Sequence, residues 1–183
     1  FGVNKRQKGV EMLEKGAVAV YGSHGLCKVS DILVPSFIEH GKEKLYYLLV
    51  SAIDTNGLLY VPVEGAEDKM RDVIQTDDAE GLVEEIGDVD EMEIPVGKKS
   101  EAAIVEVIKR NLAGEMMSMI KSLYKVKAIR ETEGKKFAAI DEKYLAIAEK
   151  LLYSEIAFAL DSDWKAIQER VRENLSQLSL ETN

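Results

Sequence analysis

The chain has 183 residues, of which 46% are hydrophobic and 31% are charged, and its formal net charge is −9. This composition is typical of a globular protein and excludes a wholly disordered chain. No apolar run approaches the roughly 18 residues that a membrane span needs, and the N-terminal residues lack the pattern of a secretion signal. The single cysteine, Cys27, can form neither an internal disulfide nor a cysteine-rich metal site. We therefore expect a protein of the reducing cytoplasm that does not contact a membrane.

The acidity of the chain is concentrated in one segment. Residues 76–97 contain nine acidic and no basic side chains, whereas residues 98–183 contain 15 basic and 14 acidic ones. Phosphate binding depends on Lys and Arg, so a net charge of −9 by itself argues against a nucleic-acid partner. Because the excess lies in residues 76–97, we interpret this segment as a solvated, self-repelling linker. The C-terminal half is slightly basic and remains compatible with DNA.

Residues 12–75 have the pattern of a small β-domain, and we interpret residues 1–11 as a leader before it. Short apolar or alternating runs predict five strands, at residues 17–21, 26–33, 46–50, 58–61 and 69–74. Asp54-Thr55-Asn56-Gly57 predicts a hairpin, because Asn-Gly readily adopts positive φ at both turn positions. Pro62 ends the fourth strand because it has no backbone N–H. Five short strands in this length predict a small β-barrel.

From residue 78 onward the hydrophobic period becomes helical. A short helix capped by Asp78 is predicted within the acidic linker of residues 76–97, and Pro95 and Gly97 mark a joint. Four longer helices are then predicted: one from Ser100 to Gly114, one ending at Gly134, one with a stripe from Tyr144 to Ala159, and one capped by Ser162. Residues 98–183 therefore form a predicted helical bundle, and the fold class is α+β with two domains.

Residues with catalytic or metal-binding potential are few. His24 and Cys27 are close enough for a nucleophile and a base, with His40 as a second histidine. Cys27 is on the same side of its predicted strand as Val29, however, which favours a small core residue over a nucleophile. The carboxylates of residues 77–93 lack the calcium-loop pattern, and no phosphate-binding glycine loop is present. We expect no enzyme activity, no cofactor and no metal.

An ordered set of short motifs resembles one protein family. The set runs from Leu13-Glu14-Lys15-Gly16 through Val20-Tyr21-Gly22-Ser23-His24-Gly25-Leu26 to Tyr46-Tyr47-Leu48-Leu49 and Leu59-Tyr60-Val61-Pro62-Val63. Two motifs in the second half of the chain complete the set. They are Ile120-Lys121-Ser122-Leu123 and the run from Leu145 to Ala157, with Ser154-Glu155-Ile156 at its centre. Together these motifs resemble the CarD and CdnL family of transcription regulators. The first domain of that family is a Tudor-like barrel shared with the transcription-repair coupling factor.

The resemblance implies a barrel that binds the β subunit of RNA polymerase and a helical domain that contacts promoter DNA and stabilises the open complex. Because polymerase carries the second domain to the DNA, a weak contact suffices there. Aligned with the family, the polymerase-binding candidates are Pro35, Leu59, Tyr60, Val61 and Pro62. The DNA-binding candidates are Lys98, Lys99, Lys125, Arg130, Lys135, Lys136 and Lys143.

This sequence departs from the family pattern in three places. Pro35 and Tyr60 stand where many members have basic residues, and residues 95–99 lack the Trp that many members insert near the edge of the transcription bubble. The missing Trp favours a second hypothesis, in which the docked protein is an adaptor whose helical domain binds another protein. A hydrolase that uses Cys27 is the third and weakest hypothesis. We expect a monomer in each case.

Overall fold

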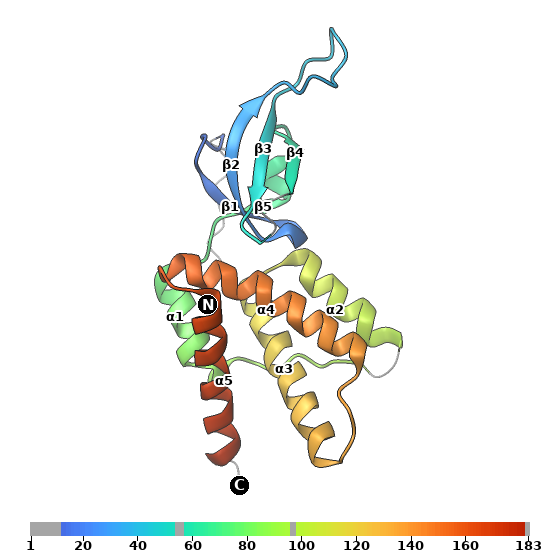
Figure 1. Ribbon diagram of the computed structural model, residues 1–183, viewed down its shortest axis with the longest axis vertical. Helices are drawn as coiled ribbons and strands as arrows, with labels where there is room; N and C mark the ends of the chain where they lie inside the picture. Colours follow the sequence, from blue (N-terminus) through green and yellow to red (C-terminus); the bar gives the residue numbers. More distant parts are fainter. Residues whose placement is uncertain (1–11, 54–56, 96–97, 182–183) are drawn as a thin grey trace.

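The protein consists of a β-sheet stacked on a group of helices along the long axis of the molecule (Figure 1). The computed structural model describes residues 12–53, 57–95 and 98–181, and for residues 98 and 178–181 it describes the backbone only. Residues 1–11 and 54–56, which include the predicted leader and most of the Asn-Gly hairpin, lie outside the described residues. The fold class is α+β, because an antiparallel sheet is followed by five α-helices.

The sheet domain contains five antiparallel strands in the order β4-β3-β2-β1-β5. Their bounds are Val18–Tyr21 (β1), Leu26–Leu33 (β2), Tyr46–Ser51 (β3), Leu58–Pro62 (β4) and Met70–Arg71 (β5). Its core is built from inward-facing residues of these strands, including Cys27, Val29, Tyr47, Leu49 and Val61. The sequence predicts a small β-barrel, but β4 and β5 do not pair in the described residues. The sheet is therefore open, because β5 has only two residues and pairs with β1 alone.

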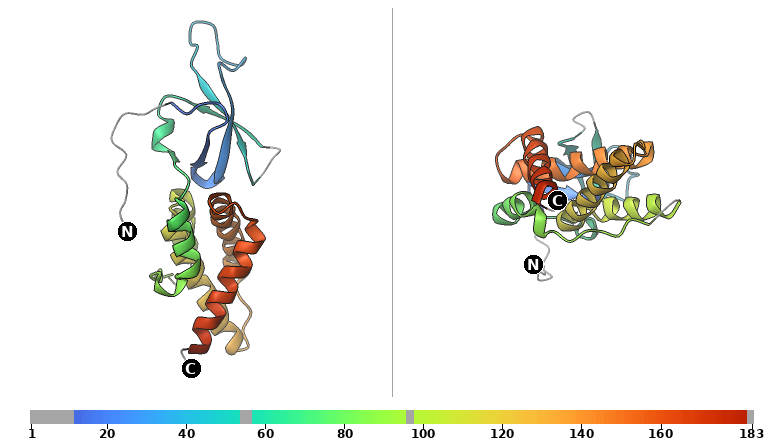
Figure 2. Two further views of the ribbon diagram at one scale, coloured as in Figure 1. Left: turned by 90° about the vertical axis from the view of Figure 1, so that its left-hand side faces the viewer. Right: turned by 90° about the horizontal axis from the view of Figure 1, so that it is seen from below.

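The helical domain is formed by α1 to α5 around one apolar core. Their bounds are Thr76–Glu84 (α1), Lys98–Arg110 (α2), Ala113–Thr132 (α3), Ala139–Ala159 (α4) and Trp164–Glu181 (α5). Helix α4 lies directly under the sheet domain, and α3 and α5 extend away from it (Figures 1 and 2). Within the described residues no helix combines the length and apolar character that crossing a bilayer would require.

Several helix boundaries differ from the sequence prediction. Asp78 and Ser100, predicted as caps, lie inside α1 and α2, which begin at Thr76 and Lys98. The second helix was expected to end at Gly114, but it ends before Asn111, whose φ of +47° breaks the helical path. Gly114 lies inside α3 instead. The last helix was expected to be capped by Ser162, whereas the Asp163 carboxylate accepts the backbone N–H of Lys165 at 2.8 Å.

The acidic segment 76–97 is part of the helical domain over most of its length. Ala79, Val83 and Ile86 are fully buried in the helical core, and Val89 and Met92 pack against the same core. The segment was expected to be a solvated spacer, because its many carboxylates are more conspicuous in the sequence than its inward-facing apolar residues. The carboxylates lie on the outer face, where Glu80 and Glu84 form ion pairs with Arg170 of α5. The segment therefore works as a packed layer of the domain.

The helical core also contains a buried carboxylate, that of Glu149 on α4. It accepts hydrogen bonds from the Tyr124 hydroxyl at 2.5 Å and from the Gln168 side chain at 2.8 Å, and Arg172 donates to the Tyr124 oxygen at 2.8 Å. Burial raises the pKa of Tyr124 to about 12. Burial also raises the pKa of Tyr153 well above its ordinary value. The network fixes α3, α4 and α5 relative to each other through directional contacts.

Truncation of Ile86 tests whether the acidic segment is a structural layer. Ile86→Ala should lower the free energy of unfolding by about 2–5 kcal/mol, because a fully buried isoleucine is replaced by a cavity. Glu85→Ala, an exposed neighbour, should change it by less than about 0.5 kcal/mol. Urea unfolding followed by circular dichroism measures both, and equal stability of the two variants would mean that the segment is a free spacer.

Candidate functional site

Strand β4 forms an exposed edge of the sheet. Among the described strands it pairs only with β3, in the register Tyr46 with Pro62, Leu48 with Tyr60 and Val50 with Leu58. Alternation along the strand points Val61 and Leu59 toward the core and leaves Leu58 57% and Tyr60 44% exposed. An edge strand with apolar outward side chains is a natural template for protein docking, because it offers both backbone hydrogen bonds and apolar contacts.

The outward face of β4 is extended by an aromatic residue from the loop between β2 and β3. Phe37 is 63% exposed, and its ring meets the ring of Tyr60 edge to face at a centroid distance of 5.4 Å and that of Tyr46 at 6.2 Å. We call Phe37, Tyr46, Leu58 and Tyr60 the aromatic surface. Soluble proteins seldom leave several large apolar side chains together in water, so a cluster of this kind marks an interaction site.

Charged residues surround the aromatic surface. Lys44 and Glu64 form an ion pair at 2.9 Å, and Lys42 and Glu39 form another at 2.7 Å. The hydrogen bond between Lys44 and Glu64 raises the pKa of Lys44 and lowers the pKa of Glu64. An apolar centre with a charged, solvated rim is the usual anatomy of a protein–protein interface.

The residues predicted to bind polymerase do not all reach the surface. Tyr60 and Pro62 are exposed, whereas Val61 belongs to the core of the sheet domain and Pro35 is buried. Leu59 is half-buried and packs against the same core. Direct contact by Val61 and Pro35 is therefore excluded in this conformation, because the two-residue alternation of a strand turns Val61 inward. Sequence reasoning missed Phe37, whose only signal was a lone aromatic residue in a polar, turn-rich loop.

Six of the predicted DNA-binding residues fall into two groups, and the seventh, Lys125, lies within α3. Arg130, Lys135 and Lys136 lie at the connection between α3 and α4, at the end of the helical domain away from the sheet (Figure 1). Lys99 is the second residue of α2 and Lys143 is the fifth residue of α4, and the two helices are joined near these positions by the hydrogen bond that Tyr144 donates to Glu101 at 2.8 Å. Lys98 is in the first turn of α2, and its side chain lies outside the described residues.

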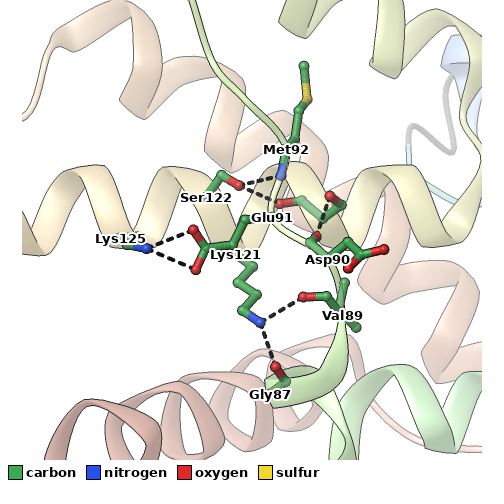
Figure 3. A network of polar contacts seen from close by, with 9 residues as sticks. Gly87, Val89, Asp90, Glu91, Met92, Lys121, Ser122 and Lys125 are labelled. Atoms are coloured by element: carbon green, nitrogen blue, oxygen red, sulfur yellow. Dashed lines mark hydrogen bonds and ion pairs between the residues drawn. The ribbon is translucent and has the colours of Figure 1, made fainter. Parts of the chain in front are cut away.

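Lysines in the middle of α3 hold the acidic segment in place (Figure 3). Lys121 donates to the backbone carbonyls of Gly87 at 2.8 Å and Val89 at 2.7 Å. Lys125, a predicted DNA-binding residue, forms an ion pair with Glu91 at 2.7 Å. Met92 donates its backbone N–H to Ser122 at 2.8 Å and completes the attachment. The ion pair with Glu91 partly neutralises Lys125, which remains exposed, so its charge is shared between the acidic segment and any phosphate.

Of the remaining basic candidates, two have intramolecular contacts at the α3–α4 connection. Lys135 forms an ion pair with Glu133 at 2.8 Å, and Arg130 donates to the backbone carbonyl of Lys136 at 3.3 Å. Lys136 itself and Lys99 are exposed. The charge available to a phosphate from this group is therefore smaller than the sequence suggests.

The hypothesis of a hydrolase rests on Cys27 as the nucleophile and His24 as the base. Cys27 is 2% exposed in the core of the sheet domain, and burial raises the pKa of its thiol to about 11. His24 is exposed in the turn after β1, where its ring stacks on Tyr21 at a centroid distance of 5.4 Å. Within the described part of the chain, no cluster of His, Cys, Asp and Glu is arranged to hold a metal ion. At neutral pH the Cys27 thiol is protonated, and protonated thiols are poor nucleophiles.

The sheet domain and its connection to α1 match a known family model. The model is the CarD-like/TRCF RID domain, in which RID denotes an RNA polymerase-interacting domain, and the match covers residues 13–74. The sheet domain of this chain is a CarD-like/TRCF RID domain. No curated protein matches the chain. The match confirms the resemblance drawn from the sequence motifs, and it assigns the edge strand and the aromatic surface to a domain of the kind that interacts with RNA polymerase.

The titration of Cys27 in the RID domain gives a pH-dependent prediction. The folded state keeps the thiol proton up to about pH 11, whereas the unfolded chain loses it near pH 9, so stability falls as the pH rises through this window. Between pH 8 and 10 the free energy of unfolding of the wild type should fall by about 1 kcal/mol more than that of Cys27→Ala. Urea unfolding at both pH values measures the difference. As a control, iodoacetamide at pH 8 should label Cys27 rapidly only in denaturant, and rapid native labelling would contradict the burial argument.

Proposed function

We propose that this chain is a bacterial, cytoplasmic transcription regulator that acts by binding alone. Its RID domain, Tudor-like in ancestry, binds the β subunit of RNA polymerase through the aromatic surface and the edge of β4. The helical domain is thereby placed near promoter DNA, where a weak, tethered contact stabilises the open complex. The proposal includes no catalytic step, cofactor or metal, and the protein acts as a monomer.

The aromatic surface is the observation that carries this proposal. Phe37 and Tyr60 present large, rigid apolar groups at the exposed edge of a domain whose family is defined by polymerase interaction. Aromatic residues with a polar rim are typical of the positions that contribute most to binding energy. The basic residues that family alignment expects near Pro35 and Tyr60 are absent from those positions, so the contact here is apolar.

Promoter contact is supported by exposed basic residues at the helical domain. Lys99 at the start of α2 and Lys136 at the α3–α4 connection are solvent-exposed. Tethering to polymerase raises the local concentration of the helical domain at the promoter, so one or two phosphate contacts are enough. Nine of the acidic residues lie in the segment 76–97, which is packed on the same domain, so the contact is weak and depends on tethering to polymerase.

A second candidate is an adaptor whose helical domain binds another protein. Two observations favour it: Lys125 and Lys135 are held in ion pairs, and Ile147 and Phe158 are exposed on α4. Exposed apolar residues on a helix suit a protein partner better than a phosphate backbone.

Substitution of the aromatic surface tests polymerase binding. Phe37→Ser and Tyr60→Ser should each weaken binding of the full chain to purified RNA polymerase by about 2 kcal/mol, roughly 30-fold, because each removes an aromatic anchor. Biolayer interferometry measures the affinity, and thermal unfolding should be nearly unchanged for these exposed positions.

Ile129→Ser is the matched control, since Ile129 is an exposed apolar residue of α3. It should bind polymerase like the wild type. Wild-type affinity in both aromatic variants would refute docking by this surface.

Salt dependence separates promoter contact from the adaptor function. If the helical domain contacts DNA, the stabilisation of polymerase on fork-junction promoter DNA should fall with salt, and Lys136→Gln should reduce the logarithmic slope by about 1. Lys165→Gln, at an exposed position on α5, should leave the slope unchanged. A slope that is indifferent to Lys136 would favour the adaptor, and Ile147→Ser should then abolish binding of the protein partner.

A further inference from the structure

A buried ion pair joins the RID domain to the helical domain. Arg71, in the last strand of the sheet, and Glu155, toward the C-terminal end of α4, are 84 residues apart. The guanidinium donates to both carboxylate oxygens, at 2.5 and 2.7 Å, and the Glu155 side chain is only 1% exposed. Two parallel hydrogen bonds fix the orientation of a guanidinium and a carboxylate as well as their distance.

Asn111, between α2 and α3, adds two further contacts to the RID domain. Its backbone carbonyl accepts the Nε–H of Arg71 at 2.8 Å, and its side-chain amide donates to the Gly22 carbonyl at 2.8 Å. Asn111 has a φ of +47°, a left-handed conformation that asparagine tolerates better than most residues. The turn between α2 and α3 is thus bonded to both β5 and the turn after β1.

The two domains also approach closely beside these polar contacts. Gly25 follows the turn after β1 with a φ of +69°, and a Cβ on it would lie 2.7 Å from Leu151 of α4 and 3.0 Å from Ile53. The turn therefore sits directly on α4, and only glycine fits there.

The short connection between the two domains is also bonded to α4, in part through the Glu155 carboxylate. The backbone N–H of Ile74 donates to Glu155 at 2.9 Å, and the Thr76 hydroxyl donates to the Ala159 carbonyl at 3.3 Å. Arg71 also donates to the Asp72 carbonyl at 3.0 Å. A connection bonded at this many points cannot act as a swivel without breaking contacts to a buried carboxylate.

We infer that Arg71, Asn111 and Glu155 form an interdomain clasp that makes the RID domain and the helical domain one rigid body. Docking of the RID domain then sets both the position and the orientation of the helical domain, without a search through a flexible linker. Glu155 is a positioning residue in this arrangement, since it acts through Arg71 and the backbone of Ile74. The inference rests on contacts within the chain and holds whichever partner the aromatic surface binds.

Residual dipolar couplings of the full chain in solution test the clasp. In the wild type, backbone amide couplings of the two domains should fit one common alignment tensor, because rigidly joined domains orient together. Two different tensors in the wild type would overturn the inference, whatever the variants do.

Opening the clasp should abolish the common tensor. The variant Arg71→Met, Glu155→Gln, Asn111→Gly removes the ion pair without leaving one buried charge unpaired. Its two domains should remain folded but require separate tensors. Asn111→Gly alone is the milder variant, since glycine readily adopts positive φ, and it should produce a smaller divergence.

Arg170→Met is the matched control, because it breaks ion pairs to Glu80 and Glu84 that lie within the helical domain. It should keep the common tensor. A common tensor retained in both clasp variants would overturn the inference. Polymerase affinity is measured separately on the same proteins, so loss of the proposed docking function and loss of interdomain rigidity are distinguished.

Discussion

The burial of one carboxylate constrains the arrangement of the whole molecule. Glu155 lies inside the contact between the sheet and α4, where an unpaired charge would cost several kcal/mol of folding free energy. Its oxygens are satisfied by the Arg71 guanidinium and by the Ile74 N–H, both of which come from the end of the RID domain. The requirement to satisfy Glu155 therefore fixes where β5, the connection to α1 and the C-terminal part of α4 lie. The aromatic surface and the exposed lysines are positioned relative to each other as a consequence.

The acidic segment shows how charge and packing are divided in this fold. Its carboxylates stay at the surface, where Arg170 and Lys125 partly neutralise them, while Val83 and Ile86 enter the helical core. Lys121 binds two backbone carbonyls of the segment and is thereby used for structure. The number of Lys and Arg residues along α3 therefore overstates the positive charge that this helix can offer to DNA. With the acidic segment included, the helical domain is acidic overall, and the exposed Lys99 and Lys136 remain for a tethered contact.

The resemblance to a family and the chemistry of the surface support each other in the RID domain. The family model matches residues 13–74, and within that range the outward residues of β4 join Phe37 in an apolar cluster. Leu59, Tyr60 and Val61 were all assigned to the contact by alignment with the family, although successive side chains of a strand point to opposite faces. The structure separates them: Tyr60 faces solvent and Val61 faces the core.

The sequence alone determined the fold class and the order of the elements, because strand alternation and helical periodicity are local properties of the chain. It also identified the family, through motifs within single strands and turns. Only the tertiary structure decided what depends on contacts between distant residues. These are the open sheet, the position of Phe37 beside Tyr60, the packing of the acidic segment, and the pairing of Arg71 with Glu155. No local pattern reveals such contacts, since a partner 84 residues away is chosen by the geometry of packing and by the cost of leaving a charge unpaired.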